Sequence, residues 1–213
     1  CPLVLVGDEQ KIHALLAKRR FKPLAAALGT DVRIHHTTEN IGMEDSIRSI
    51  RHKPNATINV GIGLAAEAYE AKRPCAFISA GHSGAVMASA LLKMGRLKNV
   101  ERPAIAVKLP TLSPNGCVLL DVGANVDCKP EHLRDFAIMG ALFAQVERQE
   151  AGLPRVGLLS NGEESSKGNE LTRASLALIA PLNCFAEGPG AVGKFVGYSE
   201  GKEIFKGQVD VVV

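Results

Sequence analysis

The sequence lacks several features that mark large classes of protein. It contains no tryptophan, only 4% of its residues are aromatic, and its formal net charge is only +3. Nucleic-acid-binding domains carry a stronger basic bias, and single-strand binders stack bases on aromatic side chains. No apolar run approaches the roughly 18 residues that a membrane-spanning helix needs. We therefore expect neither a nucleic-acid partner nor a membrane-spanning helix.

Cysteine is present but forms no recognisable pairing pattern. The five cysteines, at positions 1, 75, 117, 128 and 184, include no C-x-x-C pair. An odd count with wide spacing argues against a disulfide framework and against a structural zinc site. Thiols in apolar segments are usually small core residues, and this usage fits a reducing, cytoplasmic compartment.

The order of apolar and amphipathic segments predicts an α/β fold. Strands that are apolar throughout and alternate with helices belong to mostly parallel sheets covered on both faces. The 213 residues, 46% of them hydrophobic, suffice for a single α/β domain over 1–213. Strands are expected at 3–7, 32–34, 75–79, 103–110, 116–122, 156–160, 194–198 and 209–213. Helices are expected after Asp8, around 46–50, from Asn55, at 85–95, from Pro130 to about Glu150 with Gly152 closing it, and at 171–180.

The most informative segment is LLDVGANVDCKPEHL, residues 119–133. An apolar strand runs into a turn of small residues, and a helix then begins at Pro130. Ligands of α/β proteins bind at the carboxyl ends of strands, and a helix N-terminus favours anions. A carboxylate at the end of a buried strand is costly unless it is paired, whereas a histidine in a first helical turn can be purely structural. The candidate catalytic and binding residues here are Asp121, Asn125, Lys129 and His132.

A second junction of this kind is SAGHSGA, residues 79–85. Glycines let a backbone approach a ligand closely, and the helix that follows supplies N–H donors. Ser83 adds a hydroxyl, His82 adds a titratable group, and Gly84 completes the candidate set. A plain tight turn between a strand and a helix would have the same sequence.

A third junction is LLSNGEESSKGNEL, residues 158–171. A strand is followed by a polar loop in which Asn161, Lys167 and Asn169 are candidate binding residues. Lys167 lies among small residues and is the favoured anion contact, while Asn169 suits the N-cap of the next helix. A polar loop without function would have the same composition.

Parallel strands bring their carboxyl ends to one edge of a sheet, so the three loops are expected to converge. A site lined with backbone N–H groups, lysine, histidine and asparagine suits phosphate or another oxyanion. We expect no metal, since the acidic residues and His132 follow no recognised ligand spacing. The segment 188–193, GPGAVG, matches G-x-G-x-x-G but follows a helix, and Phe195 breaks the related P-loop pattern. No nucleotide cofactor is therefore expected.

Taken together, these segments resemble the bacterial phosphate acyltransferase family. The resemblance is carried by SAGHSGA, by RPAIAVKLPT at 102–111, by LLDVGANVDCKPEHL and by PRVGLLSNGEESSKGNEL at 154–171. It covers nearly the whole chain, in the family's order and spacing. The chain departs from the family at His82-Ser83, where Asn-Thr is usual. The family's first strand, and the segment that would follow Val213, are expected to be missing.

The resemblance implies both a fold and an activity. The fold would be a three-layer α/β/α architecture with a mostly parallel sheet, like that of the isocitrate dehydrogenase and phosphate acetyltransferase group. The activity would be transfer of an acyl group from acyl carrier protein to inorganic phosphate, giving acyl phosphate for phospholipid synthesis without a cofactor. The family also implies a cytoplasmic homodimer that associates peripherally with the membrane.

The proposed chemistry assigns a role to each candidate residue. Phosphate would be held by Ser83, Gly84, Lys129 and Lys167, and His132 or His82 would stabilise the oxyanion or protonate the leaving thiolate. Asp121 and Asn125 would orient these groups. Two alternatives stay open at this stage. One is a phosphate acetyltransferase-like enzyme that uses acyl-coenzyme A, and the other is a catalytically silent scaffold that binds carrier protein or membrane.

Overall fold

The computed structural model describes residues 2–147, 152–162, 164 and 167–213. The chain divides into two compact units, Cys1–Gly95 and Arg96–Val213, which are called unit 1 and unit 2. The sequence predicts a single α/β domain, and that expectation stays a prediction. Each unit is described by itself. No helix in the described part of the chain is long and apolar enough to cross a membrane.

Unit 1 combines a two-stranded parallel sheet with helices. Strand β1 pairs with β2 so that Leu3 lies opposite Val32. The N-cap of α1 is Asp8, as predicted, and its carboxylate accepts the backbone N–H groups of Gln10 and Lys11. The elements are β1 (Leu3–Gly7), α1 (Glu9–Leu16), a 3₁₀ turn (Arg19–Phe21), α2 (Lys22–Ala26), β2 (Val32–His36), α3 (Ser49–His52), α4 (Thr57–Glu70) and α5 (Ser83–Met94).

A buried polar network joins the last three helices of unit 1. The side chain of Asn59 on α4 donates to the carbonyl oxygens of Ile50 and Lys53, each at 2.8 Å. The hydroxyl of Ser89 on α5 donates to Oδ1 of Asn59 at 2.6 Å. Both side chains are almost fully buried, so this network satisfies groups that would otherwise be costly to bury.

The predicted strand over 75–79 is wrong. Residues 74–79 form neither helix nor strand, and the side chain of Ile78 is 91% exposed. Only Phe77 packs inward, so close to α4 that a Cβ on Gly61 would lie 2.2 Å from its ring. A buried strand needs a neighbour that pairs its backbone, and the sheet in the described part of unit 1 consists of β1 and β2, without the segment 74–79.

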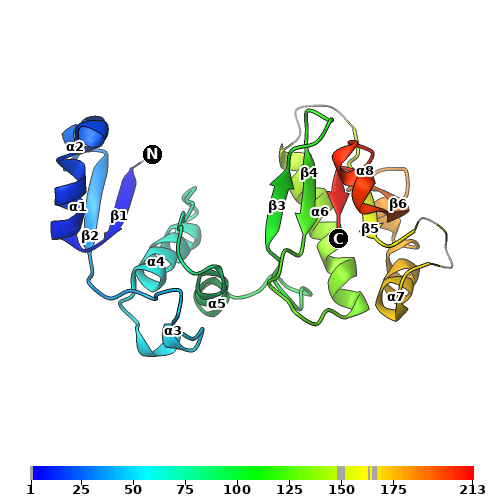
Figure 1. The fold of residues 1–213 in the computed structure, drawn as a ribbon, viewed down its shortest axis with the longest axis horizontal. Coiled ribbons are helices and arrows are strands. Elements are labelled where there is room, and N and C mark those ends of the chain that lie inside the picture. The colour runs from blue at the N-terminus through cyan, green and yellow to red at the C-terminus, as the bar shows by residue number, and fades with distance from the viewer. Residues whose placement is uncertain (1, 148–151, 163, 165–166) are drawn as a thin grey trace. The chain divides into compact units, whose positions relative to one another are not determined.

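Unit 2 is built on a five-stranded sheet with the order β3-β4-β7-β5-β6 (Figure 1). Strand β3 is antiparallel to β4, and the other pairs are parallel. The helix predicted from Pro130 is confirmed as far as Glu147, and its predicted end lies outside the described residues. The elements are β3 (Ala106–Leu109), β4 (Cys117–Leu120), α6 (Pro130–Glu147), β5 (Arg155–Leu159), α7 (Glu170–Ile179), a 3₁₀ turn (Asn183–Phe185), β6 (Lys194–Ser199), α8 (Gly201–Phe205) and β7 (Val211–Val212).

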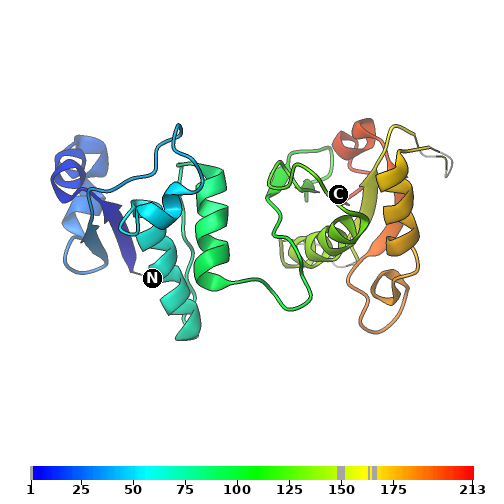
Figure 2. The same cartoon turned by 90° about the horizontal axis from the view of Figure 1, so that it is seen from below.

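Helices cover both faces of this sheet. Alternate residues of a strand point to opposite faces, so neighbouring residues pack against different helices. Val118 and Val211 belong to the main core cluster with Phe136 of α6, while Val212 packs with Ile204 of α8. Figures 1 and 2 show α6 and α7 against the sheet. The predicted three-layer α/β/α arrangement with a mostly parallel sheet is thus confirmed.

Helix α6 approaches the sheet closely at Gly140. A Cβ at this position would lie 2.6 Å from Cγ1 of Val211 and 2.8 Å from Cδ1 of Leu120.

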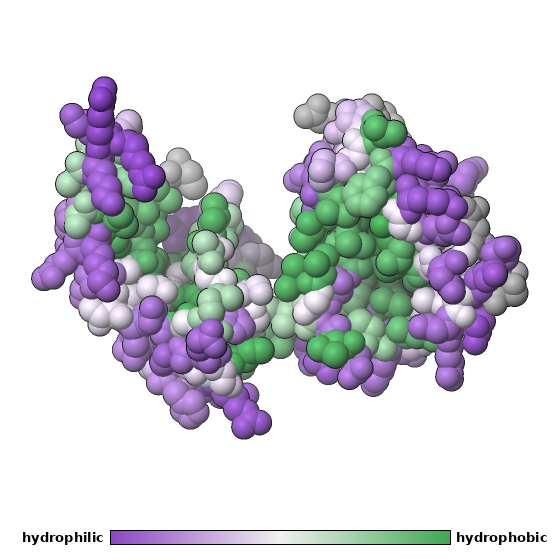
Figure 3. Space-filling view, viewed as in Figure 1, coloured by the Kyte–Doolittle hydropathy of each residue, from purple (hydrophilic) through white to green (hydrophobic). Residues whose placement is uncertain are grey.

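Apolar side chains also remain at the surface, among them Val126 at 96% and Val146 at 85% exposure. Figure 3 shows such apolar areas on both units.

Candidate active site

Two of the three predicted site loops lie at one edge of the sheet in unit 2. The loop that begins at Asp121 follows β4, and the loop that begins at Ser160 follows β5. Both strands pair in parallel with β7, which lies between them, so their carboxyl ends point to the same edge. This is the edge at which open α/β sheets bind ligands.

Asp121 organises the first of these loops through its carboxylate. Oδ1 accepts the backbone N–H groups of Ile105 at 2.8 Å and Ala124 at 3.2 Å. Oδ2 accepts the backbone N–H and the side-chain amide of Asn125, at 2.7 and 2.9 Å. Because four donors already end on this carboxylate, Asp121 is suited to fix the loop rather than to exchange protons.

Asn125 extends the same network to the start of β3. Besides its bonds to Asp121, its side-chain nitrogen donates to the carbonyl oxygen of Pro103 at 2.8 Å. The loop is thereby tied to the segment that precedes β3, on which Glu101 also lies. The structure therefore brings Asp121 and Asn125 together, and their role in orienting the reacting groups stays a prediction.

The first turn of α6 fixes the imidazole of His132. Its Nδ1 accepts the backbone N–H of Lys129 at 3.1 Å, as the third residue of a helix does in a capping box. A nitrogen that accepts carries no proton, so the ring proton is on Nε2. The side chain is only 2% exposed, and Nε2 has no aligned hydrogen bond among the described residues.

Nε2 of His132 faces the carboxylate of Glu101, a residue that the sequence analysis missed. The distance from Nε2 to Oε2 of Glu101 is 3.3 Å, and Nζ of Lys129 lies 3.9 Å from Oε1 of the same carboxylate. Lys129 and Glu101 are well exposed, whereas His132 is buried. Glu101 precedes β3 and lies 31 positions from His132 in the printed numbering, so no local spacing rule could have joined them.

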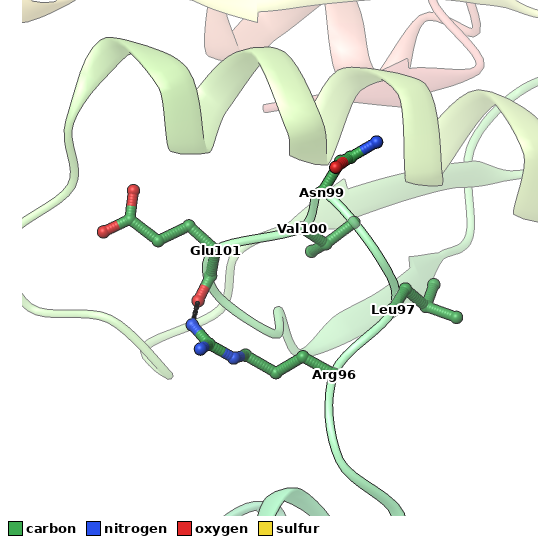
Figure 4. Close-up of a pocket in the computed structure, with 5 residues that line it drawn as sticks. All are labelled: Arg96, Leu97, Asn99, Val100 and Glu101. Atoms are coloured by element: carbon green, nitrogen blue, oxygen red, sulfur yellow. Dashed lines mark hydrogen bonds between the residues drawn. The ribbon is translucent and has the colours of Figure 1, made fainter.

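An open depression lies next to this group. It has a volume of about 520 Å³ and is lined by Arg96, Leu97, Asn99, Val100 and Glu101. Figure 4 shows the guanidinium of Arg96 turned to the backbone of Glu101, where it donates to the carbonyl oxygen at 2.8 Å. The carboxylate of Glu101 points away from that guanidinium (Figure 4).

The loop after β5 is held by its two asparagines. Oδ1 of Asn161 accepts the backbone N–H of Gly168 at 3.2 Å. Asn169 is the N-cap of α7, as predicted, and accepts the N–H of Thr172 at 2.9 Å. The side chain of Lys167 runs beside Gly162, where a Cβ would lie 2.8 Å from its Cγ. Lys167 is exposed, and its contact with an anion stays a prediction.

The SAGHSGA segment lies in unit 1, at the start of α5. His82 is the N-cap of this helix, and its Nδ1 accepts the backbone N–H of Ala85 at 3.3 Å. Ser83 is the first helical residue, and Gly84 leaves room for the His82 ring, since a Cβ would lie 3.1 Å from Cε1. That His82, Ser83 and Gly84 join the loops of unit 2 stays a prediction.

Cys128 lies inside the first loop but is not set up as a nucleophile. Burial, followed by the charges of Asp121 and Asp127, raises the pKa of its thiol. The sulfur lies 3.9 Å from the carbonyl oxygen of Asn125, to which the thiol can donate. A thiol must ionise before it attacks, so this environment disfavours covalent thiol chemistry.

No metal site is found in the parts of the chain that the structure describes, since no three His, Cys, Asp or Glu side chains come together there. The arrangement offers instead an ammonium group, an imidazole N–H and a helix N-terminus at one sheet edge. Such groups bind anions.

The α/β fold of this chain is similar to that of a solved phosphotransacetylase. The EutD phosphotransacetylase from Staphylococcus aureus matches with a TM-score of 0.62, over 100% of this chain and 69% of that chain. The two sequences are 16% identical, so this likeness shows the fold alone.

The sequence comparisons identify the family. The model of the "Fatty acid synthesis protein" family matches residues 1–213, and the chain belongs to that family. It is 47% identical over 214 residues to the phosphate acyltransferase of Synechococcus elongatus, covering 99% of this chain and 56% of that protein. The phosphate acyltransferase of Myxococcus xanthus is 45% identical over 213 residues, with 99% and 54% covered. The chain thus spans about half the length of these relatives.

Proposed function

We propose that this chain carries the phosphate-binding part of a phosphate acyltransferase. The reaction would transfer an acyl group from acyl carrier protein to inorganic phosphate, giving acyl phosphate for phospholipid synthesis. The observation that carries the proposal is the buried Nε2–H of His132 at the start of α6, which has no aligned partner and faces the same Glu101 carboxylate as the ammonium of Lys129. Relatives named phosphate acyltransferase support the reaction class.

The mechanism needs no covalent enzyme intermediate. A phosphate oxygen attacks the thioester carbonyl carbon, and a carbon–oxygen bond forms. The tetrahedral intermediate then collapses, the carbon–sulfur bond breaks, and the thiolate leaves with the carrier protein. The protein has to hold both reactants in line and to stabilise the oxyanion. The raised pKa of Cys128 agrees with direct attack by phosphate.

Each group in unit 2 has a role in this proposal. Lys129 and Lys167 hold phosphate, and the Nε2–H of His132 donates to the oxyanion or to the leaving thiolate. Asp121 and Asn125 keep the loop in place through the hydrogen bonds described above. Asn161 and Asn169 shape the loop that presents Lys167.

Replacing Lys129 by Ala tests the phosphate site. In a protein that has this chain within the full length of its relatives, Lys129→Ala should raise KM for phosphate about tenfold or more, since a charged hydrogen bond is worth about 1.5–3 kcal/mol. The KM for the thioester should change little. Unchanged phosphate dependence would remove Lys129 from the site.

The thioester donor separates this proposal from its nearest alternative. A phosphate acetyltransferase-like enzyme would turn over acyl-coenzyme A at least as well as acyl carrier protein, and the fold similarity to a phosphotransacetylase favours testing it. We expect higher kcat/KM with the carrier protein. If neither donor is turned over, the result would instead support the alternative of a catalytically silent scaffold that binds carrier protein or membrane.

The proposal also includes the assembly and location that the family resemblance implies. These are a cytoplasmic homodimer and peripheral association with the membrane. Size-exclusion chromatography with light scattering tests the dimer, and sedimentation with anionic phospholipid vesicles tests the association. A monomer, or a protein that stays in the supernatant, would remove that part of the proposal.

A further inference from the structure

We propose that the carboxylate of Glu101 occupies the anion position of the Lys129–His132 pair and has to leave it when phosphate binds. This inference rests on the proposed function, because it takes the two donors to be the phosphate site. It adds Glu101 as a residue that sets how tightly this site holds phosphate.

The contacts around Glu101 are those of a bound anion. One carboxylate oxygen lies 3.3 Å from Nε2 of His132, and the other lies 3.9 Å from Nζ of Lys129. The two donors reach the same carboxylate from different parts of the α6 N-terminus. A phosphate group presents a similar pair of oxygens, so it would meet the same two donors.

The contact between His132 and Glu101 does not have the geometry of a hydrogen bond. Nε2 is buried without an aligned partner, although Oε2 is within 3.3 Å. A buried donor of this kind gains free energy when an acceptor is placed in line with it. The Glu101 carboxylate lies in front of the Nε2–H of His132 but makes no aligned hydrogen bond with it. An anion that does make this hydrogen bond would therefore gain free energy that Glu101 does not.

Glu101 also has room to move away from this position. Its side chain is 49% exposed and borders the open depression of about 520 Å³. The guanidinium of Arg96 is already bound to the main chain of the same residue at 2.8 Å (Figure 4). A displaced carboxylate would therefore have both room and a neighbouring cation.

If the Glu101 carboxylate competes with phosphate, removing its charge should strengthen phosphate binding. Glu101→Gln keeps the size of the side chain but removes the negative charge that opposes phosphate. Phosphate should bind about fivefold more tightly, which corresponds to about 1 kcal/mol, typical of a partly exposed charge pair. The gain should shrink as salt is added, since exposed charges are screened.

The experiment is a titration of the chain with inorganic phosphate, followed by calorimetry, for wild type, Glu101→Gln and Glu131→Gln. Glu131 has the same charge in the first turn of α6, but its side chain makes no hydrogen bond or ion pair with the described residues. It is the matched control for a general change in charge. Thermal unfolding of each variant checks that the fold is kept.

The expected result is a fivefold lower Kd for Glu101→Gln and a change below about twofold for Glu131→Gln. A double variant distinguishes competition at this site from a general change in the electrostatic potential of the protein. In a Lys129→Ala background the gain from Glu101→Gln should become smaller, because the two residues act on one site. An unchanged or weaker affinity in Glu101→Gln, or an equal gain in both backgrounds, would overturn the inference.

These results can be told apart from a failure of the proposed function. Turnover with acyl carrier protein and phosphate is measured separately, in a protein of the relatives' full length. Tighter phosphate binding in Glu101→Gln without any turnover would keep the inference and reject the acyltransferase. Normal turnover with no change in phosphate binding would keep the acyltransferase and reject the role of Glu101.

Discussion

Removing the carboxylate of Asp121 should release the loop between β4 and α6. Four N–H donors end on this side chain, at distances from 2.7 to 3.2 Å. A hydrogen bond to a charged group contributes about 1.5–3 kcal/mol, and water can reach some of these donors because Asp121 is only half-buried. We therefore expect Asp121→Ala to lower the free energy of unfolding of unit 2 by about 3 kcal/mol, the equivalent of two such bonds.

The variant Asp121→Asn should lower the free energy of unfolding by less than Asp121→Ala does. Its side chain keeps one acceptor oxygen and places an amide donor against the remaining N–H groups. A loss of about 1.5 kcal/mol is expected, close to one charged hydrogen bond. Asp127→Ala is the control, since this exposed carboxylate lies in the same loop and should change stability by less than about 0.5 kcal/mol.

The assay has to report on unit 2 alone, because two compact units need not unfold together. The chain has no tryptophan and two tyrosines. Tyr69 is 72% exposed on α4, whereas Tyr198 is 7% exposed in the core of unit 2. In a Tyr69→Phe background, tyrosine fluorescence during urea unfolding follows unit 2. A loss below about 0.5 kcal/mol for Asp121→Ala would refute the role given to this carboxylate.

Three further predictions follow from buried groups. In the folded protein iodoacetamide should modify Cys75, which is exposed, well before Cys117 and Cys128, whose thiols have raised pKa values; equal rates by mass spectrometry would contradict this. Burial raises the pKa of Cys117 from 9.0 to about 12, so the folded thiol holds its proton more tightly than the unfolded one. The free energy of unfolding should therefore fall as the pH rises from 9.0 to about 12, and less so in Cys117→Ala. Asp210→Ala should cost about 3 kcal/mol in urea unfolding, because it leaves the N–H and guanidinium of Arg155 without their carboxylate; a loss below about 1 kcal/mol would count against this ion pair.

Local signals in the sequence predicted much of the fold. Asp8 and Asn169 cap the helices that they were expected to cap, because an N-cap depends on the few residues around it. Gly95 ends α5 with a positive φ of 76°, a conformation that glycine adopts readily. Apolar runs located the strands of unit 2 to within a few residues.

Features that depend on distant parts of the chain could not be predicted in this way. The apolar run at 75–79 reads as a strand, yet it finds no partner strand in the described part of unit 1. Strand β7 comes last in the sequence but lies between β4 and β5, which only the assembled sheet reveals. Glu101, in the segment before β3, and His132, on α6, meet only in the folded chain, and no motif links them.

For the site, the sequence predicted that Asp121 and Asn125 belong together, but not which hydrogen bonds each side chain makes. Asp121 and Asn125 do form one network, but the carboxylate is occupied by N–H donors and fits an orienting role. His82 acts as a helix cap through Nδ1. His132 also accepts a backbone N–H through Nδ1, but its buried Nε2 is the one that remains without an aligned bond. These roles depend on hydrogen-bond directions, which residue types alone do not fix.

The central claim is that the edge of the sheet in unit 2 binds phosphate for acyl transfer. The most direct measurement is acyl phosphate formation, trapped as the hydroxamate, by a protein that has this chain within the length of its relatives. The account predicts acyl phosphate that depends on both acyl carrier protein thioester and phosphate, with a higher phosphate KM in Lys129→Ala. Free fatty acid without acyl phosphate, or a rate independent of phosphate, would contradict it.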